Sequence, residues 1–214
     1  MIRILLAEDQ TLVRQGLKMM METDPDFRVV YEAENGAEAV RYVEGGNWVD
    51  LAVLDIRMPE MDGLEAAEKL LALDPELPVV MLTTFNDEAY ALRALTSGAR
   101  GYMLKNADAG ELIAGLRKCL DGGLLLESQV AAKVLPKLMG DVKQKAAAPL
   151  PELSERERAL LRCVGAGMNN KEIAAELYLS VGTVKNQLSQ LLDKLELRDR
   201  TQLAIFAVRH EEET

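Results

Sequence analysis

The sequence predicts an α/β protein: a doubly wound parallel sheet of five strands, followed by a small all-α domain of four helices. Over residues 1–121, short apolar runs alternate with amphipathic stretches, and Gly and Pro fall between them. From residue 153 on, apolar residues recur instead at three- and four-residue spacing. The first pattern is typical of βα units with helices on both faces of a parallel sheet, and the second of packed helices.

Each strand and helix of the first domain follows from this alternation. We expect strands at residues 2–7, 28–33, 50–55, 78–83 and 101–105. We expect helices between them near residues 11–22, 36–44, 63–73, 87–97 and 108–121. Turn signals such as Asp24-Pro25, Gly45-Gly46 and Gly122-Gly123 lie at the expected ends of these elements.

Between the two domains we expect a helical extension and a linker. Residues 127–139 have a helical pattern, and residues 140–151 are polar, then small, then bracketed by Pro149 and Pro151 without an apolar period. We therefore place the first domain at residues 1–124, the extension and linker at residues 125–150, and the second domain at residues 151–214.

The second domain carries its own helix-start signals. Ser154, with Glu157 three residues later, forms a capping box. Asn169 or Asn170 can cap a second helix and Ser180 a third, and a fourth helix runs through residues 203–208. The residues of the first three helices expected to face the core are Leu160, Leu161, Val164, Ile173, Ala174, Leu177, Val181, Val184, Leu188, Leu191, Leu192 and Leu195.

Composition limits the classes of function. The chain of 214 residues has a formal net charge of −10, which argues against indiscriminate coating of nucleic acid. Residues 156–210 nevertheless hold nine Lys or Arg against six Asp or Glu, a local balance of +3. No apolar run reaches the roughly 18–20 residues of a membrane span, and no secretory pattern is present, so we expect a cytoplasmic protein without membrane contact. Cys119 and Cys163 are expected to be buried thiols.

Chemically distinctive residues stand where four of the expected strands end: Glu8-Asp9, Asp55, Thr83 and Lys105. In a parallel sheet the carboxyl ends of the strands lie along one edge, and ligands bind there. Carboxylates gathered at that edge repel one another, and a hard cation such as Mg²⁺ relieves the repulsion. With an ammonium and a hydroxyl beside it, a central carboxylate becomes a nucleophile and a receptor for a phosphoryl group.

Two other interpretations apply to the same residues. Taken singly, each residue is also typical of a helix cap or a solvated strand end, and only their joint occurrence at four strand ends favours a site. A phosphatase with an aspartyl nucleophile needs a second acid two residues after it as proton donor. That position is Arg57, which stays protonated in proteins, so we do not expect the chain to be an enzyme.

Residues 1–121 resemble the receiver domain of two-component response regulators, which has a flavodoxin-like fold. The resemblance rests on the following segments: Glu8-Asp9, Asp55-Ile56-Arg57-Met58-Pro59 with Asp62-Gly63, Leu82-Thr83-Thr84, and Gly101-Tyr102-Met103-Leu104-Lys105. Together these segments cover the ends of four expected strands in the family's order.

The resemblance implies a role for each of these positions. It implies that Asp55 is the phosphoacceptor, that Thr83 and Lys105 contact the phosphoryl group, and that Thr83 and Tyr102 form the switch whose tyrosine rotamer follows the bound state. The implied Mg²⁺ ligands are Glu8, Asp9, Asp55 and the backbone carbonyl of Arg57. Many receivers have proline after the lysine, whereas this chain has Asn106. We expect a trans peptide bond there, because a non-proline cis bond costs about 3 kcal/mol.

The phosphoryl group is expected to come from another molecule. The chain has one histidine, His210, which lies in an acidic tail, and it has neither a phosphodonor helix nor a glycine-rich nucleotide-binding loop. A sensor histidine kinase or a small phosphodonor is therefore the expected source.

The helices expected at residues 171–177 and 181–195 have the plan of a helix-turn-helix, whose second helix lies in the major groove. Thr183, Lys185, Asn186 and Ser189 are expected to face outward near the start of that helix, where Lys and Asn side chains can read bases or phosphates. The region resembles the LuxR/NarL-type helix-turn-helix over residues 153–157, 167–174, 179–186 and 194–201. The family often has histidine at the position of Gln187.

Receiver and helix-turn-helix together imply a NarL/FixJ-type transcriptional regulator that binds double-stranded promoter DNA. A net charge of +3 in residues 156–210 is low for a domain that binds DNA as a single copy. We therefore expect a homodimer on activation, which doubles the phosphate contacts. The last helix and a face of the receiver are the candidate interfaces, and RNA polymerase is a candidate further partner. The alternative is a phosphorylation-responsive protein-interaction adaptor whose helical domain docks on protein.

Overall fold

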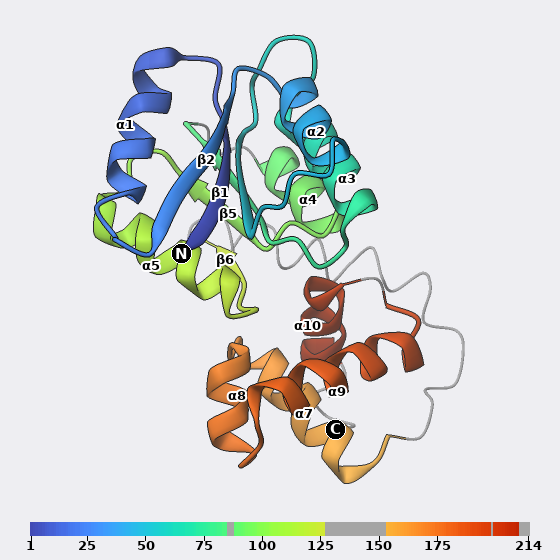
Figure 1. Ribbon diagram of the computed structural model, residues 1–214. Helices are drawn as coiled ribbons and strands as arrows, with labels where there is room; N and C mark the ends of the chain where they lie inside the picture. Colours follow the sequence, from blue (N-terminus) through green and yellow to red (C-terminus); the bar gives the residue numbers. More distant parts are fainter. Residues whose placement is uncertain (85–87, 127–152, 198, 210–214) are drawn as a thin grey trace.

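The structure, a computed structural model, describes residues 1–84, 88–126, 153–197 and 199–209. Figure 1 shows a sheet with helices on either side and, below it, a separate group of short helices. The helix expected at residues 127–139, the linker at 140–151 and the acidic tail lie outside the described residues. The domain boundaries we placed at residues 124 and 151 stay a prediction.

The sheet is entirely parallel, with strand order β2-β1-β3-β4-β5-β6. Its strands are β1 (Ile2–Ala7), β2 (Phe27–Ala33), β3 (Leu51–Asp55), β4 (Val79–Thr83), β5 (Gly101–Leu104) and β6 (Leu125–Leu126). All five expected strands are present and the doubly wound fold is confirmed. The sixth strand was not predicted, because two residues are too few to show an alternation, and it forms by pairing with β5 after the Gly122-Gly123 turn.

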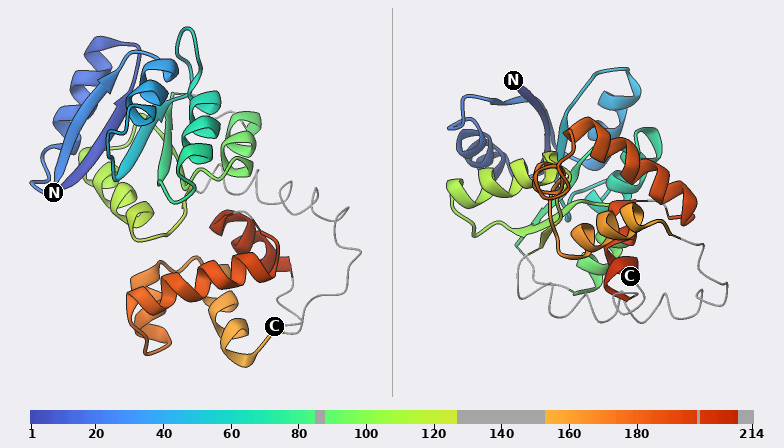
Figure 2. Two further views of the ribbon diagram at one scale, coloured as in Figure 1. Left: turned by 45° about the vertical axis from the view of Figure 1, so that its right-hand side comes forward. Right: turned by 90° about the horizontal axis from the view of Figure 1, so that it is seen from below.

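Helices cover both faces of the sheet (Figure 2). On one face lie α1 (Thr11–Met21) and α5 (Ala109–Leu120), and on the other lie α2 (Gly36–Glu44), α3 (Gly63–Leu73) and α4 (Glu88–Thr96). The strands send alternate residues to the two faces. Ile4 and Leu6 pack under α1 and α5, whereas Leu5 and Ala7 pack under α2 and α3. Both faces are therefore apolar, which explains why the strands read as continuous apolar runs.

The second domain contains four described helices: α7 (Glu155–Gly165), α8 (Asn170–Glu176), α9 (Val181–Lys194) and α10 (Arg200–Arg209). The expected caps are present. Ser154 forms the capping box with Glu157, and the Ser180 side chain accepts from the N–H of Thr183. Of the two asparagines, Asn169 caps α8. Its side chain accepts from the backbone N–H groups of Lys171 and Glu172.

The expected apolar face of the second domain forms its core, with one exception. Leu160, Leu161 and Ile173 are almost fully buried beside Val184. Val181, which we expected to face the core, is 36% exposed. It is the first residue of α9, and the helical period shows which face is apolar but not how far along that face the neighbouring helices extend.

Described residues of the two domains touch where α8 begins and where α10 meets α4. The backbone N–H of Asn170 donates to the carbonyl of Asp121 at 2.9 Å, and Lys171 Nζ lies 2.9 Å from Asp121 Oδ1. Gly122, which has φ of +81°, packs so closely against the Asn170 side chain that a Cβ has no room. At the second place α10 meets α4, and Ile205 of α10 is buried in the apolar cluster of the receiver-like domain.

The two cysteines are free buried thiols in separate domains, as expected. Burial raises the pKa of Cys119 to about 12, so this residue acts as a small apolar side chain in the core. Among the described helices, none combines the length and the apolarity needed to cross a bilayer.

Candidate functional site

The four chemically distinctive segments lie at the same edge of the sheet. Glu8 directly follows β1, Asp55 ends β3, Thr83 ends β4, and Lys105 directly follows β5. Because β1, β3, β4 and β5 are successive neighbours, these residues form a continuous row along the carboxyl edge. The topology therefore explains how segments almost one hundred positions apart come to share one crevice.

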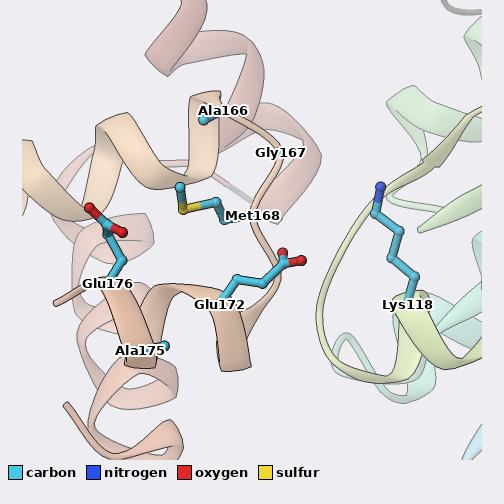
Figure 3. A pocket seen from close by; sticks show the side chains of 7 residues that line it. All are labelled: Lys118, Ala166, Gly167, Met168, Glu172, Ala175 and Glu176. Carbon is cyan, nitrogen blue, oxygen red and sulfur yellow. The ribbon is translucent and has the colours of Figure 1, made fainter. Parts of the chain in front are cut away.

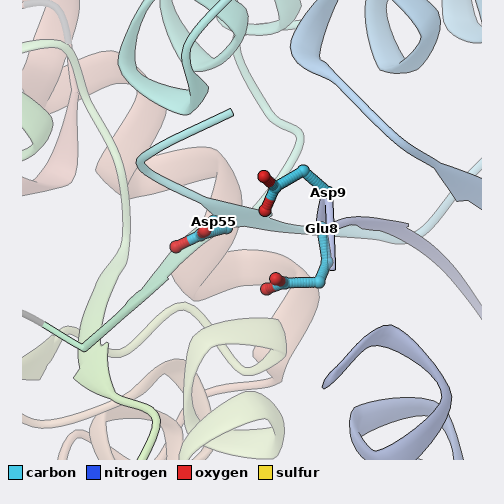
Figure 4. A group of neighbouring side chains, drawn as sticks. All are labelled: Glu8, Asp9 and Asp55. Carbon is cyan, nitrogen blue, oxygen red and sulfur yellow. The ribbon is translucent and has the colours of Figure 1, made fainter. Parts of the chain in front are cut away.

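Three carboxylates converge in this crevice. The side chains of Glu8, Asp9 and Asp55 each offer an oxygen, and these oxygens all lie within 4.8 Å of one another. Figure 4 shows Glu8 and Asp9 reaching from the end of β1 toward Asp55. Glu8 is fully buried, and Asp55 is only 6% exposed. Water therefore screens their mutual repulsion poorly.

The ammonium of Lys105 lies inside the same crevice. Its Nζ is 3.0 Å from Asp55 Oδ1 and also donates a hydrogen bond to Glu8. The backbone N–H of Lys105 donates to the carbonyl of Thr83 at 2.8 Å, which ties β5 to the end of β4. The peptide bond to Asn106 is trans, as we expected. One cation thus serves two buried carboxylates.

One lysine does not neutralise the crevice. Burial raises the pKa of Glu8 and the pKa of Asp55, although Lys105 acts in the opposite direction on both. Asp9 Oδ1 is buried, with no hydrogen-bond partner among the described residues. Converging carboxylates with an unsatisfied oxygen fit a divalent cation with oxygen ligands, as Mg²⁺ requires. The acidic cluster is therefore suited to the metal that the sequence predicted.

The position of Asp55 is fixed by the turn that follows it. The N–H of Ile56 donates to Asp55 Oδ1 at 2.8 Å, and the N–H of Gly63 donates to the carbonyl of Ile56 at 2.9 Å. Gly63 lies directly against the main-chain carbonyl of Asp55, where a Cβ would overlap that oxygen. The Asp62-Gly63 pair is thus explained by packing: Asp62 caps α3, and Gly63 leaves room for Asp55.

The remaining expected receiver residues lie around this centre. Thr83 is 1% exposed at the end of β4, and Tyr102 is completely buried on the α2–α4 face of the sheet. The side chain of Arg57 is exposed and extends toward α4, where its Nη2 donates to the Tyr90 hydroxyl at 3.3 Å. Sequence reasoning gave Arg57 a role only through its carbonyl, and it missed this side-chain contact with Tyr90.

A second residue that sequence reasoning missed is Arg14. Its guanidinium is buried beside the acidic turn and donates to the backbone carbonyl of Glu8. The sequence carried a signal for this contact. Arg14 stands three residues before Leu17 and seven before Met21, so it shares their buried face of α1. A charged residue on the apolar face of a helix indicates a partner inside the protein.

The expected DNA-contacting residues lie on an open face of the second domain. Lys185, Asn186 and Ser189 are exposed on α9, and Thr183 is half-buried in its first turn. Val184 and Leu188, on the opposite side of the helix, are buried. The structure thus brings the four residues together on one side of α9, and this outward face is accessible while the two domains are in contact.

A separate cleft lies between the domains, beside the contact of Asp121 with Asn170 (Figure 3). Lys118 of α5 borders it on one side, and Glu172 and Glu176 of α8 border it on the other. It is remote from the acidic crevice at the carboxyl edge of the sheet. Two exposed carboxylates and one lysine provide no set of groups that favours a particular ligand, so we assign none.

A doubly wound sheet with an acidic carboxyl edge, joined to a helix-turn-helix, defines the class of two-domain transcription regulators. Comparison with known proteins gives the family. Residues 4–117 match the response regulator receiver domain, and residues 151–207 match the luxR family of bacterial regulatory proteins. The chain therefore belongs to the response regulators with a LuxR-type DNA-binding domain, a family of transcription regulators.

Relatives match over almost the whole chain. The transcriptional regulatory protein LnrK of Bacillus subtilis is 38% identical over 216 residues, covering 98% of each chain. The DNA-binding transcriptional activator DevR/DosR of Mycobacterium tuberculosis is 37% identical over 207 residues, covering 97% of this chain and 94% of the relative. The family assignment thus rests on both domains together.

Solved structures agree. The response regulator ChrA of a heme-sensing two-component system has 34% identity and a TM-score of 0.53, covering 99% of this chain and 98% of that one. The response regulator RcsB in its complex with DNA is 21% identical, with a TM-score of 0.58 over 97% of this chain and 98% of that chain, and it supports the fold alone.

Proposed function

We propose that Asp55 accepts a phosphoryl group from a sensor histidine kinase and that this modification controls sequence-specific promoter binding by α9. The observation that carries the proposal is the crevice itself, in which three carboxylate oxygens lie within 4.8 Å and Lys105 Nζ lies 3.0 Å from Asp55 Oδ1. A carboxylate beside a fixed cation is suited to accept a phosphoryl group.

The reaction transfers a phosphoryl group from a histidine nitrogen to a carboxylate oxygen. An Asp55 carboxylate oxygen attacks the phosphorus of a phosphohistidine, the P–N bond breaks, and the histidine leaves as an imidazole that takes up a proton. The product is an acyl phosphate. Lys105 and the Thr83 hydroxyl are proposed to bind its oxygens, and Lys105 already lies beside the acceptor.

Magnesium would be held by Glu8, Asp9, Asp55 and the backbone carbonyl of Arg57, and it supplies positive charge to the phosphoryl oxygens when bound. These protein groups orient the acceptor and keep water from the carboxylates, since Glu8 and Asp55 are buried. Burial raises the pKa of both carboxyls because it disfavours their charged form, and a bound cation would offset that cost.

The phosphorylation test uses the full chain with acetyl phosphate and MgCl₂, followed by phosphate-affinity electrophoresis. We expect the wild type to shift and Asp55→Ala to remain unshifted at matched concentrations. Asp62→Ala is the matched control, because Asp62 is a nearby acid that caps α3 instead of joining the carboxylate cluster. A shift of the Asp55→Ala protein equal to that of the wild type would show that the acceptor is elsewhere.

We further propose that the switch acts through dimerisation. Lys185, Asn186 and Ser189 are exposed while the domains are in contact, which argues against simple masking of the α9 face. By contrast, α10 is held against α4 through Ile205, so its pairing with a second copy competes with the receiver. Phosphorylation would loosen this contact and allow two DNA-binding domains to occupy a two-fold site.

Sedimentation velocity tests this step. With a beryllofluoride complex as the acyl-phosphate mimic, we expect a dimer that binds palindromic promoter DNA more tightly than the monomer. Asp121→Ala removes the partner of Lys171 and should shift the equilibrium toward the dimer without the mimic. A protein that stays monomeric with the mimic but still binds DNA more tightly would contradict the dimerisation proposal.

The location and the remaining partners follow from this role. Promoter DNA and the phosphohistidine of a kinase are both met in the cytoplasm, where we place the protein. RNA polymerase is proposed as a partner of the DNA-bound dimer. A relative described as a DNA-binding transcriptional activator, together with the match to the luxR family, favours this function over that of a protein-interaction adaptor.

A further inference from the structure

The turn between β1 and α1 carries two of the three carboxylates, and it is built differently from the six helix starts whose N-cap bonds are described. In α2, α3, α5, α7, α8 and α9, the N-cap side chain accepts a hydrogen bond from the helix. At the start of α1 the N-cap residue is Gln10, and its side chain makes no such bond. Asp9 stands one position earlier, with its carboxylate in the crevice and not on the helix. The acidic turn therefore needs another support.

Arg14 reaches back from the second turn of α1 to provide one. Its Nη1 donates to the backbone carbonyl of Glu8 at 2.6 Å, and its Nη2 donates to Glu34 Oε1 at 2.9 Å. Its Nε lies 3.7 Å from Glu32 Oε2. The side chain is only 9% exposed. The guanidinium thus joins the end of β1 to the carboxyl end of β2.

This contact fixes the main chain of Glu8 from both sides. The N–H of Glu8 donates to the carbonyl of Ala33 at 3.0 Å, and its carbonyl accepts from Arg14. With both ends of the residue held, the Glu8 side chain leaves the main chain at a fixed point, and its carboxylate accepts from the Gln10 N–H and from Lys105. Rigid support behind a ligand is what sets the affinity of a metal site.

We propose that Arg14 is a positioning residue for the Mg²⁺ site: its bond to the Glu8 carbonyl aligns Glu8 and Asp9 with Asp55. This inference rests on the proposed function, because it assumes that the three carboxylates bind Mg²⁺. Arg14 itself touches neither the metal nor the phosphoryl group. Its effect is therefore on metal affinity, and the chemistry at Asp55 and Lys105 is unchanged once the metal is bound.

The experiment measures Mg²⁺ binding to the full chain by isothermal titration calorimetry. We expect Arg14→Gln to weaken Mg²⁺ binding about tenfold, as is typical when the support of a metal ligand is lost. In phosphorylation by acetyl phosphate, the Mg²⁺ concentration for half-maximal rate should rise by the same factor. The rate at saturating Mg²⁺ should stay within about twofold of wild type, because excess metal then keeps the site occupied by mass action.

Lys18→Gln is the matched control. Lys18 lies one turn further along α1, and its Nζ pairs with Glu32 Oε1 at 2.6 Å, but it has no bond to Glu8. The Lys18→Gln variant removes one positive charge from α1, as Arg14→Gln does. A purely electrostatic effect on Mg²⁺ affinity would therefore appear in both variants. We expect Lys18→Gln to change Mg²⁺ affinity less than about twofold. Equal affinities for the Arg14→Gln and Lys18→Gln proteins would overturn the inference.

Arg14→Lys keeps the test decisive if Arg14→Gln does not fold, as judged by circular dichroism. Lysine lacks the planar fork with which the guanidinium reaches the Glu8 carbonyl and Glu34 through separate nitrogens, so we expect an intermediate loss of Mg²⁺ affinity, about threefold. Wild-type affinity in a folded Arg14→Lys protein, with Arg14→Gln unfolded, would overturn the inference. Absence of Mg²⁺ binding by the wild type would instead refute the proposed function.

Discussion

The acidic crevice holds its charged groups inside the protein, whereas the outward face of α9 holds its charged and polar groups in water. In the crevice, Lys105 is 9% exposed and pairs with two buried carboxylates. On α9, Lys185 and Asn186 are exposed. The crevice is therefore assembled by folding, and each of its charges affects stability. The charges of the α9 face stay in water in the folded protein, so we expect them to contribute to DNA binding and little to stability.

Removing Lys105 tests the first half of this comparison and has the largest expected effect. In Lys105→Ala the Glu8 and Asp55 carboxylates lose their cation, and we expect the free energy of unfolding to fall by about 3 kcal/mol. Phosphorylation by acetyl phosphate should slow by about 100-fold. Urea unfolding and phosphate-affinity gels measure the two effects.

The control for this prediction is Lys69→Ala on α3. Lys69 pairs with Glu65 at 2.9 Å, and both side chains are 48% exposed. We expect a loss of about 0.3 kcal/mol, as for exposed pairs one turn apart. Similar losses in the two variants would mean that burial does not distinguish the crevice.

Gly63 and Gly16 give a second contrast, with effects of opposite sign. A Cβ at Gly63 would overlap the carbonyl of Asp55, whereas a Cβ at Gly16 would meet nothing within 4 Å. We expect Gly63→Ala to destabilise the protein by about 2 kcal/mol. Gly16→Ala should stabilise it by about 0.5–1 kcal/mol, because alanine favours the helix. Thermal unfolding measures both, and a neutral Gly63→Ala would show that the turn beneath Asp55 is not tightly packed.

Lys185→Ala tests the other half of the comparison. We expect DNA affinity to fall about tenfold, in the range for the loss of one contact to DNA. The melting temperature and phosphorylation should match those of the wild type, since Lys185 is exposed. Lys69→Ala, which removes the same charge from α3, should leave DNA affinity unchanged in mobility-shift titrations. A drop in stability for Lys185→Ala would contradict the separation of the two regions.

A smaller expected effect concerns Glu157 at the start of α7. Lys194 and the capping box lower the pKa of Glu157 to about 2 from its ordinary 4.5. A depressed pKa adds stability above the unfolded value, and that stability is lost as pH falls through the folded value. Glutamine keeps the capping box and loses the ion pair, so Glu157→Gln should cost about 0.5 kcal/mol at pH 7.

The pH dependence separates this effect from packing. The difference in melting temperature between the wild type and Glu157→Gln should shrink as the pH falls below 4.5 and vanish near 2. A difference that persists unchanged at low pH would mean that Lys194 does not act through the charge of Glu157. The measurement is a series of calorimetric scans on the two proteins.

Much of the fold and of the candidate crevice could be predicted from the sequence, because both depend on local patterns. Buried parallel strands are continuous apolar runs, and their ends are marked by the first polar residue, so Glu8, Asp55 and Lys105 were identified together. The caps Ser154 and Ser180 were found for the same reason, since each acts on a backbone N–H three residues away.

What could not be predicted depends on contacts between distant segments. β6 exists because it can pair with β5, and Arg14 is buried because Glu8, Glu32 and Glu34 surround it. The burial of Ile205 depends on a receiver helix more than one hundred residues earlier. Periodicity within a helix shows which face is apolar, but it does not show which partner covers that face.

The short strand β6 gives the connection between the domains a defined starting point. Its residues pair with Gly101 and Tyr102 of β5, and Leu126 is the last described residue before the segment that leads to the second domain. The chain thus leaves the first domain while attached to the strand that carries the buried tyrosine and runs directly into Lys105. A displacement of β5 would therefore also displace β6, the last described part of the chain before the second domain.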